Sequence, residues 1–106
     1  MINKTIDSQG IISSSGSIIY TPSKGYIGHI DSIKFNNSKD KDYKIALYRY
    51  IAKSRTKILL YKYELSAGDM VDDIQSYQLK DGDYLYAIAS SEVVFTINGT
   101  EIIKER

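Results

Sequence analysis

Short runs of β-branched and aromatic residues recur along the whole chain, and turn residues separate them. These runs span residues 17–20, 26–35, 43–51, 57–65, 84–89 and 93–97. Gly, Asn, Asp and Ser lie between them, at roughly the 8–12-residue spacing that is typical of a sandwich or barrel. No convincing amphipathic helix longer than two turns is present. The pattern therefore predicts an all-β fold: an antiparallel β-sandwich of jelly-roll or Ig-like type, with seven to eight short strands.

Three of these runs carry further local signals. The apolar spacing between residues 26 and 35 breaks near Asp31-Ser32, which predicts a β-bulge there. Residues 43–51 carry apolar or aromatic side chains on both faces, which predicts a central strand covered on two sides. Asn98-Gly99 follows residues 93–97 and is a strong hairpin signal, so residues 100–103 are expected to pair back or to form the final edge.

A Leu-x-x-Gly-Asp pattern occurs twice, at an offset of 14 residues. The copies are Leu65-Ser66-Ala67-Gly68-Asp69 and Leu79-Lys80-Asp81-Gly82-Asp83. Each places a glycine, which is free to adopt positive φ, just before a strand-like run. The repeat therefore predicts two similar turns that each lead into a strand.

The length of 106 residues and 12.0 kDa fits one domain. Residues 1–16 are polar and Ser-rich, and they predict a flexible N-terminal arm, with a short edge strand around Gly10 as the alternative. Residues 17–106 then form the β-sandwich domain. No cysteine is present, so stability must come from the core or from neighbouring subunits.

The composition excludes several classes of function. The net charge is +1, which gives no general attraction to nucleic acid or to an anionic membrane. The first ten residues lack the apolar segment of a secretory signal, and no apolar run is long enough to span a bilayer. His29 is the single histidine, and no phosphate-binding glycine loop is present. We therefore expect no enzyme activity, no cofactor, no metal and no membrane partner.

Two weaker alternatives come from charged residues. Aspartates cluster near the Gly-Asp turns, and calcium favours oxygen-rich loops; they are Asp69, Asp72, Asp73, Asp81 and Asp83. Asp is also a routine turn residue that bonds its own backbone. The basic stretch 53–57 lies near Arg49 and could contact single-stranded nucleic acid. A solvated hairpin tip is the plainer interpretation of this stretch, so we expect no specific nucleic-acid binding.

Tyrosine is unusually abundant, with ten copies, most of them on predicted strands. Strict alternation places Leu59, Tyr61 and Tyr63 on one face of the run 57–65. A small domain cannot easily bury so many rings, and tyrosine is enriched at protein interfaces and in sugar-binding platforms. The sequence predicts an interface that contains Tyr48, Tyr50, Tyr61, Tyr63 and Arg55.

The order of these motifs resembles that of a known group of proteins. A Pro/Gly turn at 20–25 is followed by elements at 30–37, 45–48, 65–69, 79–90 and 93–99. Over about residues 18–103, this layout is similar to small β-sandwich proteins encoded among bacteriophage structural genes. These are head–tail ring or adaptor proteins, head decoration proteins and minor tail proteins. The high Tyr content and the polar N-terminus depart from the pattern, which leaves the position in the virion open.

The resemblance implies a non-enzymatic structural component of a bacteriophage virion. Such a protein would assemble as repeated copies at the head–tail junction, in the tail or on the capsid surface. Its partners would be other virion structural proteins and copies of itself, and it would reach the virion after synthesis in the host cytoplasm. The alternative is a carbohydrate-binding module in which exposed tyrosines stack on a glycan.

Overall fold

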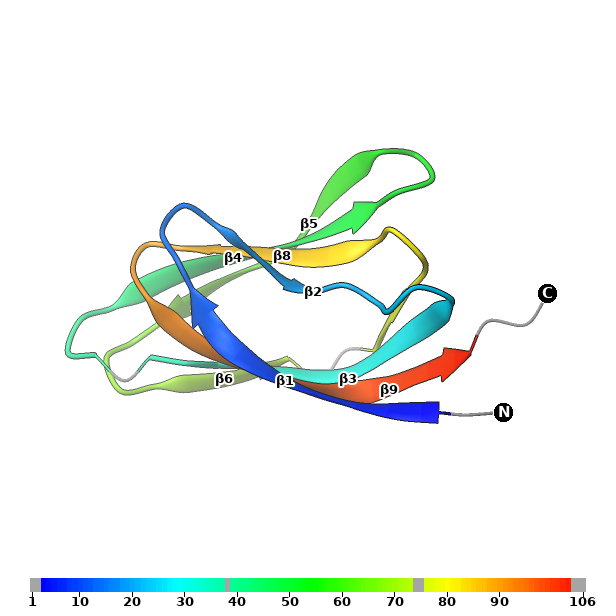
Figure 1. The fold of residues 1–106 in the computed structure, drawn as a ribbon. Helices are drawn as coiled ribbons and strands as arrows, with labels where there is room; N and C mark the ends of the chain where they lie inside the picture. The colour runs from blue at the N-terminus through cyan, green and yellow to red at the C-terminus, as the bar shows by residue number, and fades with distance from the viewer. Residues whose placement is uncertain (1–2, 38, 74–75, 104–106) are drawn as a thin grey trace.

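A computed structural model describes residues 3–37, 39–73 and 76–103. In this part of the chain it contains nine strands and no helix (Figure 1): β1 (Asn3–Ile12), β2 (Ser17–Tyr20), β3 (Tyr26–Asn36), β4 (Tyr43–Ile51), β5 (Thr56–Leu65), β6 (Met70–Asp73), β7 (Tyr77–Leu79), β8 (Tyr84–Ala89) and β9 (Val93–Ile103). One sheet has the order β1-β9-β3-β6, with β7 also paired to β3, and the other has the order β2-β8-β4-β5. All pairs are antiparallel, and the two sheets pack together, so the predicted β-sandwich is confirmed.

The pairing of strands identifies the type of sandwich. β1 pairs with β9, β2 with β8, β3 with β6 and β7, and β4 with β5. The chain is thus one long antiparallel ribbon whose four successive strand pairs alternate between the two sheets. This nested arrangement is that of a jelly roll. Of the two expected sandwich types, the structure adopts this one.

The inward-facing side chains of both sheets form a single apolar core. On the five-stranded sheet Ile33, Phe35 and Ile97 are fully buried, and on the four-stranded sheet Leu47 and Leu85 are fully buried. Alternation along β4 places Ile45 and Leu47 on this inner side, where both are buried. Its other face is only half-buried and is open to solvent, so the expectation that β4 is covered on two sides was wrong. Tyr48 and Tyr50 are among the half-buried side chains of that face.

The bulge predicted near Asp31 is confirmed, because the pairing of β3 with β9 shifts between Ile30 and Ser32. The hairpin predicted at Asn98-Gly99 was wrong, since β9 continues without a break to Ile103. Gly99 faces the bulged strand so closely that an added Cβ would lie 2.0 Å from the backbone oxygen of His29. The glycine therefore permits close approach of two backbones rather than a turn.

Residues 3–12 form an edge strand, which differs from the flexible arm expected over 1–16. β1 pairs with β9 along its entire length and buries Ile6 and Ile12. Its remaining side chains are mostly polar, so the sequence pattern was weak. With this strand the described residues contain nine strands, one more than the upper end of the predicted seven to eight. The serine-rich segment that follows is a tight turn, in which Gly16 donates a hydrogen bond to the Ser13 carbonyl at 3.1 Å.

The two Leu-x-x-Gly-Asp segments adopt the same conformation, as the repeat predicts. Gly68 and Gly82 have φ of 76° and 83°, in the left-handed region that favours glycine. The Asp69 N–H donates to the Ser66 carbonyl at 2.9 Å, and the equivalent bond from Asp83 measures 3.0 Å. The two turns lead into β6 and β8 respectively.

Candidate interaction surface

The outer face of the four-stranded sheet carries a group of apolar side chains that lie outside the core. Alternate residues of its strands point away from the partner sheet, because their neighbours are buried inside. We call this surface the tyrosine face; its apolar members are Ile18, Ala46, Tyr48, Tyr50, Leu59, Tyr84, Tyr86 and Ile88. Ile18 is 56% exposed and Leu59 is 44% exposed. Exposed apolar side chains gathered in this way are typical of an interaction site.

Register between strands brings the four tyrosines of this face into pairs. Tyr50 on β4 lies directly opposite Tyr84 on β8, and their rings stack with centroids 4.6 Å apart. Tyr48 lies opposite Tyr86 in an edge-on contact at 6.2 Å. The ammonium of Lys57 lies 4.2 Å from the centre of the Tyr86 ring. Several ring faces are therefore already occupied within the chain.

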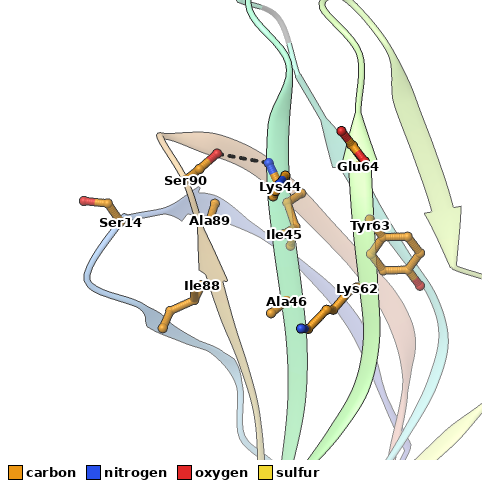
Figure 2. A pocket seen from close by; sticks show the side chains of 10 residues that line it. All are labelled: Ser14, Lys44, Ile45, Ala46, Lys62, Tyr63, Glu64, Ile88, Ala89 and Ser90. Carbon is orange, nitrogen blue, oxygen red and sulfur yellow. Dashed lines mark hydrogen bonds between the residues drawn. The ribbon is translucent and has the colours of Figure 1, made fainter.

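A groove of about 730 Å³ opens at one end of this face (Figure 2). Its lining includes Ala46 and Ile88, with Lys44, Lys62 and Glu64 from β4 and β5. The Lys44 backbone is tied to the adjacent turn, since its N–H donates to the Ser90 hydroxyl at 3.0 Å. The groove thus continues the tyrosine face as a shallow surface in which two ammonium groups flank a small apolar patch.

The predicted interface residue Arg55 lies at the tip of the β4–β5 hairpin, which projects from the sandwich (Figure 1). It is exposed, has a φ of 53° and donates from its backbone N–H to the Ala52 carbonyl at 3.2 Å. Lys53 is exposed in the same turn. The tip therefore adds two cations beside the tyrosine face.

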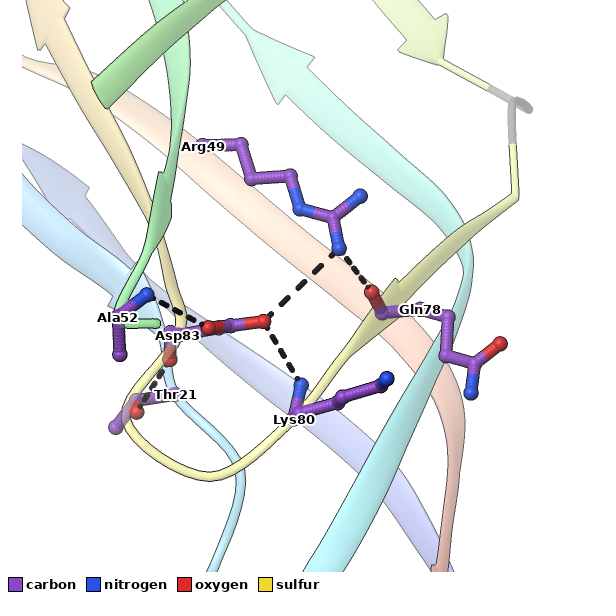
Figure 3. Close-up of polar contacts among 6 residues, drawn as sticks. All are labelled: Thr21, Arg49, Ala52, Gln78, Lys80 and Asp83. Carbon is purple, nitrogen blue, oxygen red and sulfur yellow. Dashed lines mark hydrogen bonds and ion pairs between the residues drawn. The ribbon is translucent and has the colours of Figure 1, made fainter. Parts of the chain in front are cut away.

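The base of this hairpin is fixed from the inner side by Arg49 and Asp83 (Figure 3). Arg49 donates to the Gln78 carbonyl, and its Nη2 atom lies 4.0 Å from the Asp83 carboxylate. That carboxylate also accepts the backbone N–H groups of Ala52, at 2.9 Å, and Lys80, at 3.0 Å. Asp83 thus joins two turns that lie far apart in sequence, and Arg49 serves this joint rather than the exposed tip.

The four predicted interface tyrosines divide into two groups. Tyr48 and Tyr50 lie on the tyrosine face, whereas Tyr61 and Tyr63 lie on the inner side of β5. The pairing of β4 with β5 shifts between Leu47 and Tyr48, so the side-chain alternation of β5 reverses after Leu59. The prediction from strict alternation that Tyr61 and Tyr63 share a face with Leu59 was therefore wrong. Alternation could have suggested Tyr84 and Tyr86, but their pairing depends on distant strands.

Tyr63 takes part in a polar cluster that joins β5 to β6 and β7 of the other sheet. The hydroxyls of Tyr63 and Tyr77 both donate to one oxygen of Asp73, each at 2.8 Å. Burial, followed by the bond to this carboxylate, raises the pKa of both phenols above the usual range for tyrosine. Tyr61 stacks on Tyr63 with ring centroids 5.5 Å apart. The ring and the hydroxyl of Tyr63 are therefore both used within the fold.

The aspartates of the predicted calcium alternative serve separate contacts in the fold. Asp81 accepts the Gly25 N–H at 3.1 Å, Asp83 holds the hairpin base, and Asp73 holds two tyrosines. Over residues 3–37, 39–73 and 76–103 there is no group of three His, Cys, Asp or Glu side chains that could hold a metal ion. In the same part of the chain, no helix has the length and hydropathy needed to cross a bilayer.

Comparison with known proteins gives no relative. No family model, no curated protein and no solved structure matches the chain.

Proposed function

We propose that this protein is a non-enzymatic structural component of a bacteriophage virion that assembles as repeated copies. The observation that carries the proposal is the tyrosine face, a broad apolar surface on a chain whose core is complete without it. Tyrosine is enriched at interfaces because its ring supplies contact area and its hydroxyl tolerates water. Jelly rolls are also common among viral capsid proteins, which supports the class by analogy alone.

Repetition makes such a surface effective. A contact that is weak between two copies becomes strong when a ring or lattice makes it many times over. The motif order of the sequence is similar to that of head–tail ring, head decoration and minor tail proteins. The head–tail junction, the tail and the capsid surface are the three positions that fit this mode of action.

The carbohydrate-binding alternative would use the same tyrosines in another way. A sugar ring stacks on the free face of an aromatic ring, and in this chain Tyr50 and Tyr84 stack on each other. Their exposed edges and hydroxyls suit a protein partner better than a sugar ring. Binding on a broad glycan array that is lost in Tyr50→Ala, by a chain that stays monomeric, would favour the alternative.

The test combines self-association with location. Sedimentation velocity over a wide range of concentration is expected to show oligomers of the wild-type chain. The double variant Tyr50→Ala/Tyr84→Ala should shift them toward monomer, and Asp40→Ala, in an exposed loop away from this face, should not. Mass spectrometry should find the chain in purified virions of the phage that encodes it. A chain that stays monomeric and is missing from those virions would exclude the proposal.

A further inference from the structure

The two broad outer faces of the sandwich carry opposite charge. The tyrosine face includes three lysines, Lys44, Lys57 and Lys62, against a single acid, Glu64. The outer face of the five-stranded sheet carries three exposed aspartates against one lysine, Lys34; the aspartates are Asp7, Asp31 and Asp72. We call this second surface the acidic face. Its other outward side chains are mostly Thr, Asn and Gln.

We propose that copies of this chain stack head to tail, with the tyrosine face of one copy covering the acidic face of the next. This inference rests on the proposed function and specifies the contact by which copies assemble. A symmetric contact between two tyrosine faces would bring two surfaces of net positive charge together, and like charges across an interface oppose association. Contact between unlike faces pairs lysines with aspartates instead.

The acidic face also offers apolar contact. Ile11 on β1 lies opposite Val94 on β9, and the same row continues through Asn36 to Met70 on β6. Ile11 and Met70 are each 57% exposed. An apolar row on a charged surface is well suited to receive Ile18, Leu59 and the tyrosine edges of the neighbouring copy.

Size permits such a contact. The molecule measures 49 × 27 × 19 Å along its principal axes, and the sheets form its broad sides. A standard interface buries about 800 Å² on each partner, which a broad side of this molecule can supply. Because the two faces differ, each added copy leaves one face of each kind free. Such a heterologous contact closes into a ring when the rotation per copy allows it and extends as a filament otherwise.

Charge reversal on one face at a time tests the inference. Lys57→Glu/Lys62→Glu disables the tyrosine face, and Asp7→Lys/Asp72→Lys disables the acidic face. All four side chains are exposed, so unchanged circular dichroism and thermal unfolding should show that both variants fold. Each variant alone is expected to need at least roughly tenfold more protein to assemble than wild type. In an equimolar mixture one variant carries two acidic faces and the other carries two basic faces, so unlike copies should assemble again through both faces.

The outcomes separate this inference from the proposed function. If the wild-type chain assembles and both variants assemble equally well, head-to-tail stacking is wrong and assembly through another surface stands. A mixture that remains monomeric also overturns the stacking. If the wild-type chain is monomeric alone but present in virions, a different virion protein covers the face and the stacking is excluded. If it is monomeric and missing from virions, both proposals are lost.

Discussion

The tyrosines inside the sandwich and those on the tyrosine face use opposite ends of the same side chain. Inside, Tyr20 donates its hydroxyl to the buried Glu101 carboxylate at 2.7 Å, as Tyr63 and Tyr77 do to Asp73. On the tyrosine face, Tyr50 and Tyr84 contact each other through their rings. In the inner group Tyr20 and Tyr63 join the two sheets and Tyr77 joins β7 to β6, whereas the outer group joins neighbouring strands of one sheet.

This difference assigns separate tasks to the two groups. A buried carboxylate must be satisfied by donors, so loss of an inner hydroxyl bond removes one of the donors on which it depends. An outer ring pair remains in contact with water, so its hydroxyls can be replaced by solvent. We therefore expect stability to depend on the inner group and assembly to depend on the outer group.

The largest expected effect comes from removing the acceptor shared by two inner tyrosines. Asp73→Ala should lower the free energy of unfolding by about 3 kcal/mol, because two hydroxyls lose their acceptor in a buried site. The measurement is urea unfolding at a protein concentration low enough to prevent assembly. Asp72→Ala is the matched control, since Asp72 is its exposed neighbour on β6, and it should change stability by less than about 0.5 kcal/mol. Equal effects of the two substitutions would contradict the structural role of the inner cluster.

Alkaline pH should act on the same inner group. Burial, followed by the bond to a carboxylate, raises the pKa of Tyr20, Tyr63 and Tyr77. An unfolded tyrosine loses its proton near pH 10, while these phenols keep theirs in the folded chain. Their contribution to stability is therefore complete below about pH 10 and is lost progressively above it.

Urea unfolding midpoints measured on either side of pH 10 provide the test. The midpoint should fall as pH rises, and Tyr77→Phe, which removes one of the three groups, should make the fall shallower. A midpoint that does not change with pH, or a slope that Tyr77→Phe leaves unchanged, would contradict the assignment.

Much of the fold could be predicted from local pattern. The bulge near Asp31 and the two Gly-Asp turns follow from residue spacing and from the backbone freedom of glycine. The predictions that failed concern features that are set by contact with a neighbouring strand. Asn98-Gly99 has the sequence of a hairpin, yet Gly99 is required by the close approach of β3. β1 has only two buried apolar residues, and its pairing with β9 spans nearly the whole chain, so no local signal revealed it.

The residues of the tyrosine face were predicted in part for the same reason. Simple alternation puts Tyr48 and Tyr50 on the same face of β4, and the structure shows that this face is the outer one. Tyr63 points inward because a register shift reverses the side-chain alternation of β5. That shift is defined by the pairing of β5 with β4, so the sequence of β5 alone does not reveal it. The partners Tyr84 and Tyr86 come from a strand more than 30 residues further along the sequence. Register between distant strands, and not residue type, forms the tyrosine pairs.

The smallest expected effect compares the phenolic oxygen of an inner tyrosine with that of an outer tyrosine. Tyr77→Phe and Tyr84→Phe each delete one phenolic oxygen and keep the ring. Tyr77→Phe removes one of the donors to a buried carboxylate and should lower the free energy of unfolding by about 1 kcal/mol. Tyr84→Phe retains the stack on Tyr50 and should change it by less than about 0.5 kcal/mol. Urea unfolding of both variants at low protein concentration measures the difference. If Tyr84→Phe costs as much as Tyr77→Phe, the outer hydroxyl also supports the fold, and the division between inner and outer tyrosines does not hold.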